Sequence, residues 1–194
     1  MPAVLLLAAG SSSRLGRPKQ LLMYQGSTLL RRAAETAVAA AAGAPVLVIT
    51  GALHTELLPE LHGLLLTATR CVDWAEGMGA SLKYGLAVLE SICATWEDLL
   101  VMLCDQPLVN SELLLCLQET SAATGKPIVA AEYEGVRGAP AYFRREVRPL
   151  LQRMPSGAGA GQLFKQHPEL VAAVPFPAGA IDVDTEEQYA ALPA

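Results

Sequence analysis

Short apolar runs alternate along this chain with longer stretches in which apolar residues recur at helical spacing. This alternation is typical of βαβ units, in which parallel strands are joined by helices that cover the faces of a sheet. We therefore predict an α/β fold with a mostly parallel sheet. The strands are predicted at residues 3–8, 46–50, 66–70, 99–104, 128–133, 140–143 and 170–175.

The segments between these strands are predicted to be helical. Residues 28–42 lie between a polar cap and Gly43, and residues 78–96 repeat apolar side chains on one face. A third helix is predicted at 111–123 with Ser111 as its cap. The glycine-rich stretch 157–161 is predicted to be a loop that leads into a short helix around 163–165.

The 194 residues fit one compact domain spanning 1–194, since domains commonly contain about 100–200 residues. With 52% hydrophobic residues, 17% charged residues and a net charge of -5, the chain is neither disordered nor built for nucleic acid, which requires a basic face. Its apolar runs are far shorter than the ~20 residues that cross a bilayer, so no membrane association is expected.

The first apolar run has no basic segment before it and stops at Gly10, which is unlike a secretory signal peptide. A cytoplasmic location is therefore expected. The four cysteines contain no CxxC pair and are interpreted as reduced, mostly buried side chains.

The loop after the first predicted strand has a composition suited to phosphate. It is bounded by Gly10 and Gly16 and carries Arg14 and Lys19. Glycine and serine let backbone N–H groups approach an anion, and the basic side chains supply positive charge. The spacing matches neither the Walker A loop nor the GxGxxG fingerprint, which removes the main support for P-loop and NAD-binding readings. The alternative is an ordinary strand-to-helix turn with solvated basic side chains.

The strand predicted at 99–104 leads directly into Asp105. In open α/β sheets the ligand crevice lies beyond the carboxyl ends of the strands, so Asp105 is expected beside the Gly10 loop. A carboxylate at that position is a candidate ligand for Mg²⁺, with Mn²⁺ as an alternative, because such ions bind one or two carboxylates together with water and substrate phosphates. The competing interpretation is an Asp that caps the following turn.

Two further segments carry candidate binding residues. Asp182 and Asp184 alternate, which puts both carboxylates on one face of an extended segment. One is expected to bind metal and the other to cap a helix that begins near Thr185, and the spacing does not decide between them. The alternative is that Asp184 or Thr185 is an ordinary N-cap. Gly77 and Ser81 join a glycine turn to a helix N-terminus, where backbone amides and a hydroxyl can contact base, ribose or phosphate, although a plain capped helix has the same pattern.

Taken in order, LAAGSSSRLGRPK at 7–19, GMGASLKYGL at 77–86, CDQP at 104–107 and DVDT at 182–185 resemble the motifs of the MobA-like nucleotidyltransferases, and most of all the molybdenum cofactor cytidylyltransferases. The resemblance implies a Rossmann-like three-layer α/β domain whose N-terminal part binds a nucleoside triphosphate and whose C-terminal part binds the acceptor. It implies that base and ribose contact Leu7, Ala8, Ala9 and Gly10. The implied phosphate-binding and catalytic residues are Arg14 and Lys19, and the implied metal ligands are Asp105 and Asp184.

The resemblance also implies the substrates. The Ala-Ala-Gly opening resembles the cytidylyl branch, in which CTP donates CMP to the phosphate of molybdopterin, a phosphorylated pterin. A molybdoenzyme or its maturation chaperone is then a possible receiver of the product.

The chain departs from the family pattern at two places. It has Gly138-Ala139-Pro140 where Gly-His-Pro is common, and the loop 157–161 lacks the usual Asp and Arg. Two alternatives therefore stay open: another phosphorylated acceptor such as a sugar phosphate, and a partner protein that binds nucleotide or cofactor without turnover. The loop 157–161 is expected to close over the acceptor.

Overall fold

A seven-stranded sheet forms the centre of the molecule in the computed structural model, which describes residues 1–12 and 15–193. Its strands are β1 (Ala3–Ala8), β4 (Val46–Thr50), β5 (Thr67–Arg70), β6 (Asp98–Leu103), β7 (Ile128–Tyr133), β8 (Val136–Arg144) and β9 (Val171–Pro175). A separate hairpin pairs β2 (Met23–Tyr24) with β3 (Ser27–Thr28). The order across the sheet is β5-β4-β1-β6-β8-β7-β9, and β8 alone among the strands of this sheet runs antiparallel to its neighbours. The prediction of an α/β fold with a mostly parallel sheet is confirmed.

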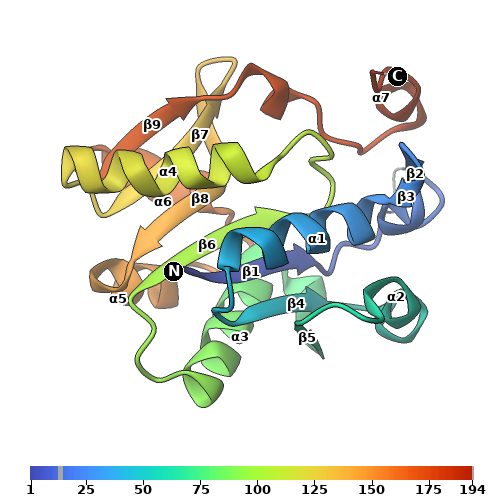
Figure 1. The fold of residues 1–194 in the computed structure, drawn as a ribbon, viewed down its shortest axis with the longest axis horizontal. Coiled ribbons are helices and arrows are strands. Elements are labelled where there is room, and N and C mark those ends of the chain that lie inside the picture. The colour runs from blue at the N-terminus through green and yellow to red at the C-terminus, as the bar shows by residue number, and fades with distance from the viewer. Residues whose placement is uncertain (13–14, 194) are drawn as a thin grey trace.

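Helices cover both faces of the sheet (Figure 1). On one face lie α1 and α4, and on the other lie α3, α5 and α6. The α-helices are α1 (Leu29–Ala41), α2 (His54–Leu61), α3 (Met78–Ile92), α4 (Ser111–Thr124), α5 (Arg148–Arg153), α6 (Ala160–Gln166) and α7 (Glu186–Ala190). Short 3-10 helices form at η1 (Lys19–Leu21), η2 (Trp74–Glu76), η3 (Arg145–Val147), η4 (Pro168–Leu170) and η5 (Pro177–Ala180). Among the residues that the structure describes, no helix combines the length and the hydrophobicity that a bilayer crossing requires.

The largest error in the predicted strands is at β8, which was expected at 140–143 and is nine residues long. The strand begins earlier because Glu134 and Gly135, both with positive φ, form a two-residue turn that pairs β8 with β7 from its first residue. The pairing of β7 with β8 is irregular at one point, where the register shifts between Ala130 and Ala131.

The helix ends also show where sequence signals mislead. Thr28 caps α1 by accepting a hydrogen bond from the backbone N–H of Arg31, close to the predicted start. The predicted cap of α4 was wrong: Asn110 caps it, with Oδ1 2.9 Å from the Leu113 nitrogen, and Ser111 is the first helical residue. An Asn beside a Ser offers two equally good caps, and only the backbone conformation selects one.

Alternate residues of β1 face the two layers of helices. Val4, Leu6 and Ala8 pack in the core under α1 and α4, whereas Leu5 and Leu7 pack in the core that includes α3. All of β1 is buried, as expected for a central strand covered on both faces.

Gly85 allows α3 to approach the sheet closely. A Cβ at this position would lie 3.1 Å from Ile49 Cδ1 and 3.2 Å from Leu5 Cδ1, both on buried strands. We expect Gly85→Val to lower the free energy of unfolding by about 1–3 kcal/mol, because overpacking a filled core forces side chains off their rotamers. Urea denaturation should show this loss. Ala87→Val on the exposed face of the same helix is the control, and equal losses in both variants would contradict close packing as the cause.

Candidate functional site

The candidate site lies where β1 and β6 end side by side. Leu7 pairs with Leu103 in the parallel register of these strands, and the Cys104 N–H donates to the Leu7 carbonyl. The loop after β1 and Asp105 after β6 therefore emerge at the same edge of the sheet, as predicted from the sequence. The β2–β3 hairpin and α7 lie beyond the carboxyl end of β1 (Figure 1).

Lys19 joins two carboxylates that are far apart in the sequence. Its Nζ lies 2.5 Å from Asp105 Oδ2 and 2.6 Å from Asp184 Oδ1, and all three side chains are at most 20% exposed. The DVDT segment reaches this point because the Val183 N–H donates to the Asp105 carbonyl and its side chain is fully buried. Burial disfavours the charge on Lys19, but the two carboxylates outweigh it and raise the pKa of Lys19 above its ordinary value.

The structure distinguishes Asp182 from Asp184 by their contacts. Asp184 is the one that contacts Lys19, whereas Asp182 accepts a hydrogen bond from Gln188 Nε2 at 3.1 Å. Burial, followed by repulsion from Asp184 and Asp105, raises the pKa of Asp182. The expectation that one of the aspartates caps the helix is wrong, because the cap is Thr185, whose hydroxyl accepts from the Gln188 N–H in a capping box.

Beside this cluster lies a cavity of about 280 Å³ between the loop after β1 and the start of α3. Seven of the residues singled out in the sequence line it: Leu7, Ala9, Gly10, Lys19, Gly77, Ser81 and Asp105. Ala8 does not line it, because the alternation of β1 turns its methyl group toward α1, and this part of the prediction is not supported by the geometry. Arg14 lies outside the described residues.

Trp74 also lines this cavity, although sequence analysis gave it no role of its own. It lies on η2, and it approaches the loop after β1 only because residue 51 is glycine. A Cβ on Gly51 would lie 2.8 Å from Trp74 Cγ and would also clash with the carbonyl oxygen of Ala9. The aromatic side chain of Trp74 gives this cavity an apolar surface on which a flat ring can stack.

The glycine-rich stretch 157–161 is a loop only as far as Gly159, because α6 begins at Ala160, earlier than the predicted helix. Its closure over an acceptor stays a prediction. The loop packs against the start of α3: the Ala80 N–H donates to the Ser156 carbonyl at 3.1 Å, and a Cβ on Gly77 would lie 2.8 Å from that carbonyl oxygen and from Gly157 Cα. Gly77 also has a φ of +123°, so both its backbone and its neighbours favour glycine. The loop therefore supports the wall of the first cavity.

A buried glutamine fixes the shape of the loop after β1. Gln20 is 1% exposed, and its Nε2 donates to the Ala8 carbonyl at 3.1 Å and to the Gly10 carbonyl at 2.7 Å. Its Oε1 accepts from the hydroxyl of Ser12, whose oxygen accepts from the Lys19 N–H. Sequence analysis missed this residue, since a Gln after a Lys is typical of a solvated surface.

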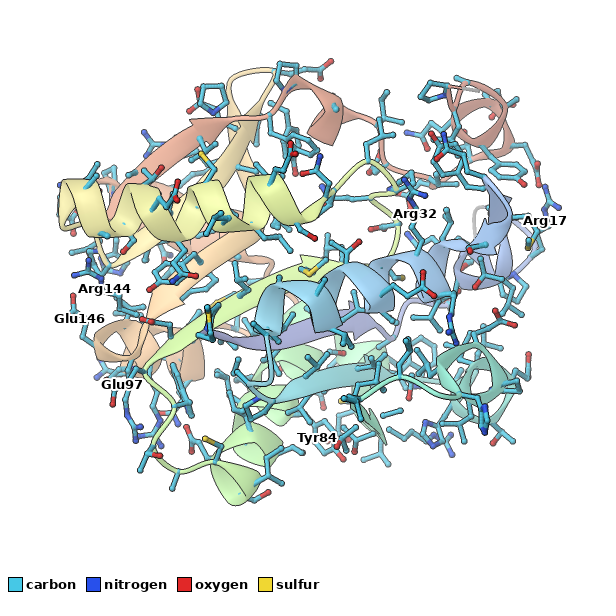
Figure 2. The ribbon with its side chains drawn as sticks, viewed as in Figure 1. Arg17, Arg32, Tyr84, Glu97, Arg144 and Glu146 are labelled. Carbon is cyan, nitrogen blue, oxygen red and sulfur yellow. The ribbon has the colours of Figure 1, made fainter. Side chains whose placement is uncertain are left out.

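Two arginines join the surrounding segments. Arg32, labelled in Figure 2, reaches from α1 to donate from Nε to the Pro107 carbonyl at 2.8 Å, beside the CDQP turn. Arg17, also labelled, makes a two-pronged contact with Glu186 at the start of α7. The ion pair of Arg17 with Glu186 is about half exposed, so it contributes little to the free energy of unfolding, but it orients the C-terminal segment.

A second cavity of about 220 Å³ shares Leu103 and Asp105 with the first. Its wall has polar groups from Gln106, Tyr133 and Asp182, and none of the described residues that line it is Lys or Arg. Gln106 is 5% exposed, and its Oε1 has no hydrogen-bond partner among the described residues. Asp105 thus stands between two cavities, an arrangement suited to bringing two ligands together.

The residues present fit a divalent cation. Asp105 and Asp184 offer the oxygen ligands that Mg²⁺ and Mn²⁺ prefer. The buried Oδ1 of Asp105 has no hydrogen-bond partner among the described residues, so protein groups do not fully satisfy this carboxylate, whose Oδ2 faces Lys19. No group of three or more His, Cys, Asp or Glu side chains in the described part of the chain is placed to hold a metal. A cation here would thus complete its shell with water and with oxygens of a bound phosphate.

The neighbouring thiol is not suited to nucleophilic chemistry. Burial, reinforced by the charge of Asp105, raises the pKa of the Cys104 thiol to about 12. The thiol is therefore neutral, as the interpretation of the cysteines as buried apolar groups expects.

Comparison with known proteins identifies the family of the chain. Residues 4–171 match the family model described as "MobA-like NTP transferase domain". Nicotine blue oxidoreductase of Paenarthrobacter nicotinovorans is 34% identical over 197 residues, which cover 94% of this chain and 92% of that protein.

Solved structures share the fold. Rv0371c of Mycobacterium tuberculosis H37Rv superimposes with a TM-score of 0.76 at 28% identity, covering 98% of this chain and 96% of its own, and it is also known in complex with manganese. A nucleotidyl transferase from Methanothermobacter has a TM-score of 0.79 at 21% identity, covering 98% of this chain and 94% of its own.

Proposed function

Because this chain belongs to the MobA-like NTP transferase family, we propose that it transfers CMP from CTP to the phosphate of a phosphorylated pterin, molybdopterin, and releases pyrophosphate. The observation that carries the proposal is the Lys19–Asp105–Asp184 cluster, whose Asp105 lines both cavities. One cavity suits a nucleotide and the other an acceptor.

We assign the nucleotide to the larger cavity. Its base would stack on Trp74 near Ala9, and its triphosphate would extend along the amides of Gly10 and Ser11 toward Lys19. The buried hydroxyl of Ser81 provides a further polar contact at the start of α3.

We assign the acceptor to the smaller cavity. Its polar wall offers hydrogen-bond acceptors and carboxylates but no described cationic side chain, so it suits the neutral, donor-bearing ring of the acceptor rather than its phosphate. That phosphate would extend toward Asp105 and meet the nucleotide there.

The proposed reaction needs no side chain that acts as a general base, because the attacking phosphate is already ionised. An oxygen of the acceptor phosphate forms a bond to the α-phosphorus of CTP as the bond to the β-phosphate oxygen breaks, and pyrophosphate leaves with the electron pair. A divalent cation held by Asp105 and Asp184 would supply Lewis-acid neutralisation of the phosphate charge. Lys19 stabilises the charge that develops on the leaving group, and the two cavities align the reacting atoms.

We do not propose for this chain the oxidoreductase activity that the name of the 34% identical relative states. The loop after β1 lacks the GxGxxG spacing of dinucleotide-binding folds, and the cluster presents ionic groups suited to phosphate and metal. Transfer to a sugar phosphate is the second candidate, since sugar hydroxyls also suit the wall of the smaller cavity.

The proposal is tested by measuring pyrophosphate release with each nucleoside triphosphate, with and without molybdopterin. We expect CTP with molybdopterin to be at least about 10-fold better in kcat/KM than GTP, because the Ala9 methyl group crowds a purine and one such contact is worth about 10–200-fold. Ala9→Gly should reduce this preference. A preference for GTP would contradict the assignment of the nucleotide, and turnover with a sugar phosphate alone would favour the second candidate.

Gln20→Met should weaken CTP binding. The variant keeps the length of the side chain but leaves the buried Ala8 carbonyl and the part-buried Gly10 carbonyl without this donor, which costs about 1–3 kcal/mol and relaxes the loop. Calorimetric titration with CTP should show the loss of affinity, and urea unfolding should show the loss of stability. Gln118→Met on α4 is the control. Unchanged CTP affinity would mean that the amide supports the fold alone.

A further inference from the structure

The ammonium group of Lys19 occupies the position between the two carboxylates that a divalent cation would need. It lies 2.5 Å and 2.6 Å from one oxygen each of Asp105 and Asp184, and a magnesium ion bound to the same oxygens would lie about 2.0–2.1 Å from them. The two cations cannot occupy these contacts together. The other oxygen of Asp105 is buried away from solvent, so Oδ2 is the oxygen that an incoming cation meets.

The larger cavity offers the Lys19 ammonium group a second position when a nucleotide is bound there. Its side chain lines the larger cavity, and a Cβ on Gly10 would lie 4.0 Å from Lys19 Cε, so the lysine stem runs beside the loop assigned to the triphosphate. The Lys19 backbone is fixed by the contact of its N–H with Ser12, which leaves the flexible stem as the part that moves. A triphosphate offers the ammonium several anionic oxygens in exchange for two carboxylates.

We propose that Lys19 is an internal counterion that competes with divalent metal for Asp105 and Asp184, and that a nucleoside triphosphate removes this competition by drawing the ammonium into the larger cavity. The proposal rests on the proposed function for the identity of the nucleotide. Its consequence is cooperative binding: metal alone binds weakly, nucleotide strengthens metal binding, and by thermodynamic reciprocity metal strengthens nucleotide binding by the same factor.

Binding of Mn²⁺, followed by electron paramagnetic resonance, tests this competition without turnover. In the absence of nucleotide, Lys19→Met should bind Mn²⁺ at least about 5-fold more tightly than the wild-type protein, and Lys19→Arg, which keeps the positive charge, should stay weak. CTP should strengthen Mn²⁺ binding to the wild type by about 5–150-fold, the usual range for coupled sites, and much less in Lys19→Met. Chelation of Mn²⁺ by free CTP is the same for both proteins and cancels in the comparison.

A second measurement uses the wild-type protein. The chain has four lysines, so selective ¹⁵N labelling of their Nζ atoms gives a small set of signals, and the one missing from Lys19→Arg belongs to Lys19. Addition of CTP in the presence of a chelator should shift this signal, because the ammonium exchanges carboxylate for phosphate without any metal.

The outcomes separate the two proposals. Equal or weaker Mn²⁺ binding by Lys19→Met, or a Lys19 signal that CTP binding leaves in place, would overturn the counterion role. If CTP binds to neither protein while Lys19→Met still binds Mn²⁺ more tightly, the competition at the carboxylates is supported and the cytidylyl transfer is overturned. The double variant Asp105→Asn with Lys19→Met should lose the added Mn²⁺ affinity, and its retention would place the metal elsewhere.

Discussion

Asp105→Asn is expected to reduce CTP-dependent pyrophosphate release by about 10³-fold or more. The amide keeps the shape of the side chain but removes the negative charge that would hold a divalent cation. Such a cation stabilises the transition state by several kcal/mol, and each factor of ten in rate corresponds to about 1.4 kcal/mol of activation free energy. The fold should remain, because Asp105 follows a strand end and its backbone carbonyl still accepts from the Val183 N–H. Steady-state kinetics in Mg²⁺, with circular dichroism of the variant, provides the measurement.

Glu97→Gln is the matched control for this substitution. Glu97 is an exposed acidic residue just before β6, at the opposite end of the strand from the site (Figure 2). The same chemical change there should leave kcat and KM unaltered. Near-normal turnover of Asp105→Asn in Mg²⁺ would show that the metal assignment is wrong.

Lys19→Ala is expected to lower kcat by about 10²–10³-fold with a smaller change in the KM for CTP. The charge on the departing pyrophosphate grows toward the transition state, so an ammonium directed at it contributes more there than in the bound ground state. Loss of kcat should accompany tighter binding of Mn²⁺ without nucleotide, a combination that general misfolding does not produce. Lys126→Ala, at a lysine that contacts the Glu169 carbonyl, is the control. An unchanged kcat with only a raised KM would instead assign Lys19 to uniform binding.

The strands and the first site residues could be predicted because their signals are local. Apolar runs bounded by glycine and polar residues gave β1, β4 and β7 their observed bounds. The abrupt change from an apolar strand to Asp105 indicated the edge of the sheet where ligands bind.

Other parts of the site depend on distances that no local pattern contains. Which of Asp182 and Asp184 contacts Lys19 depends on the full burial of Val183 between them. Alternation along the sequence shows that the two aspartates share a face, but it does not show which residues that face contacts. The role of Gln20 depends on two carbonyls that face inward only after the loop has closed. The approach of Trp74 to the cavity depends on the missing side chain of Gly51 in another strand-to-helix loop.

The cluster at Lys19 has a consequence for the order in which the protein is made. Its carboxylates lie 86 and 165 residues beyond the lysine, and the second comes from the C-terminal segment, after the region 4–171 that matches the family model. During synthesis the central strands β4, β1 and β6 can pair before that segment leaves the ribosome. A nascent chain can therefore form these strands before Asp184 has been synthesised, and at that stage Lys19 has only Asp105 of its two carboxylate partners.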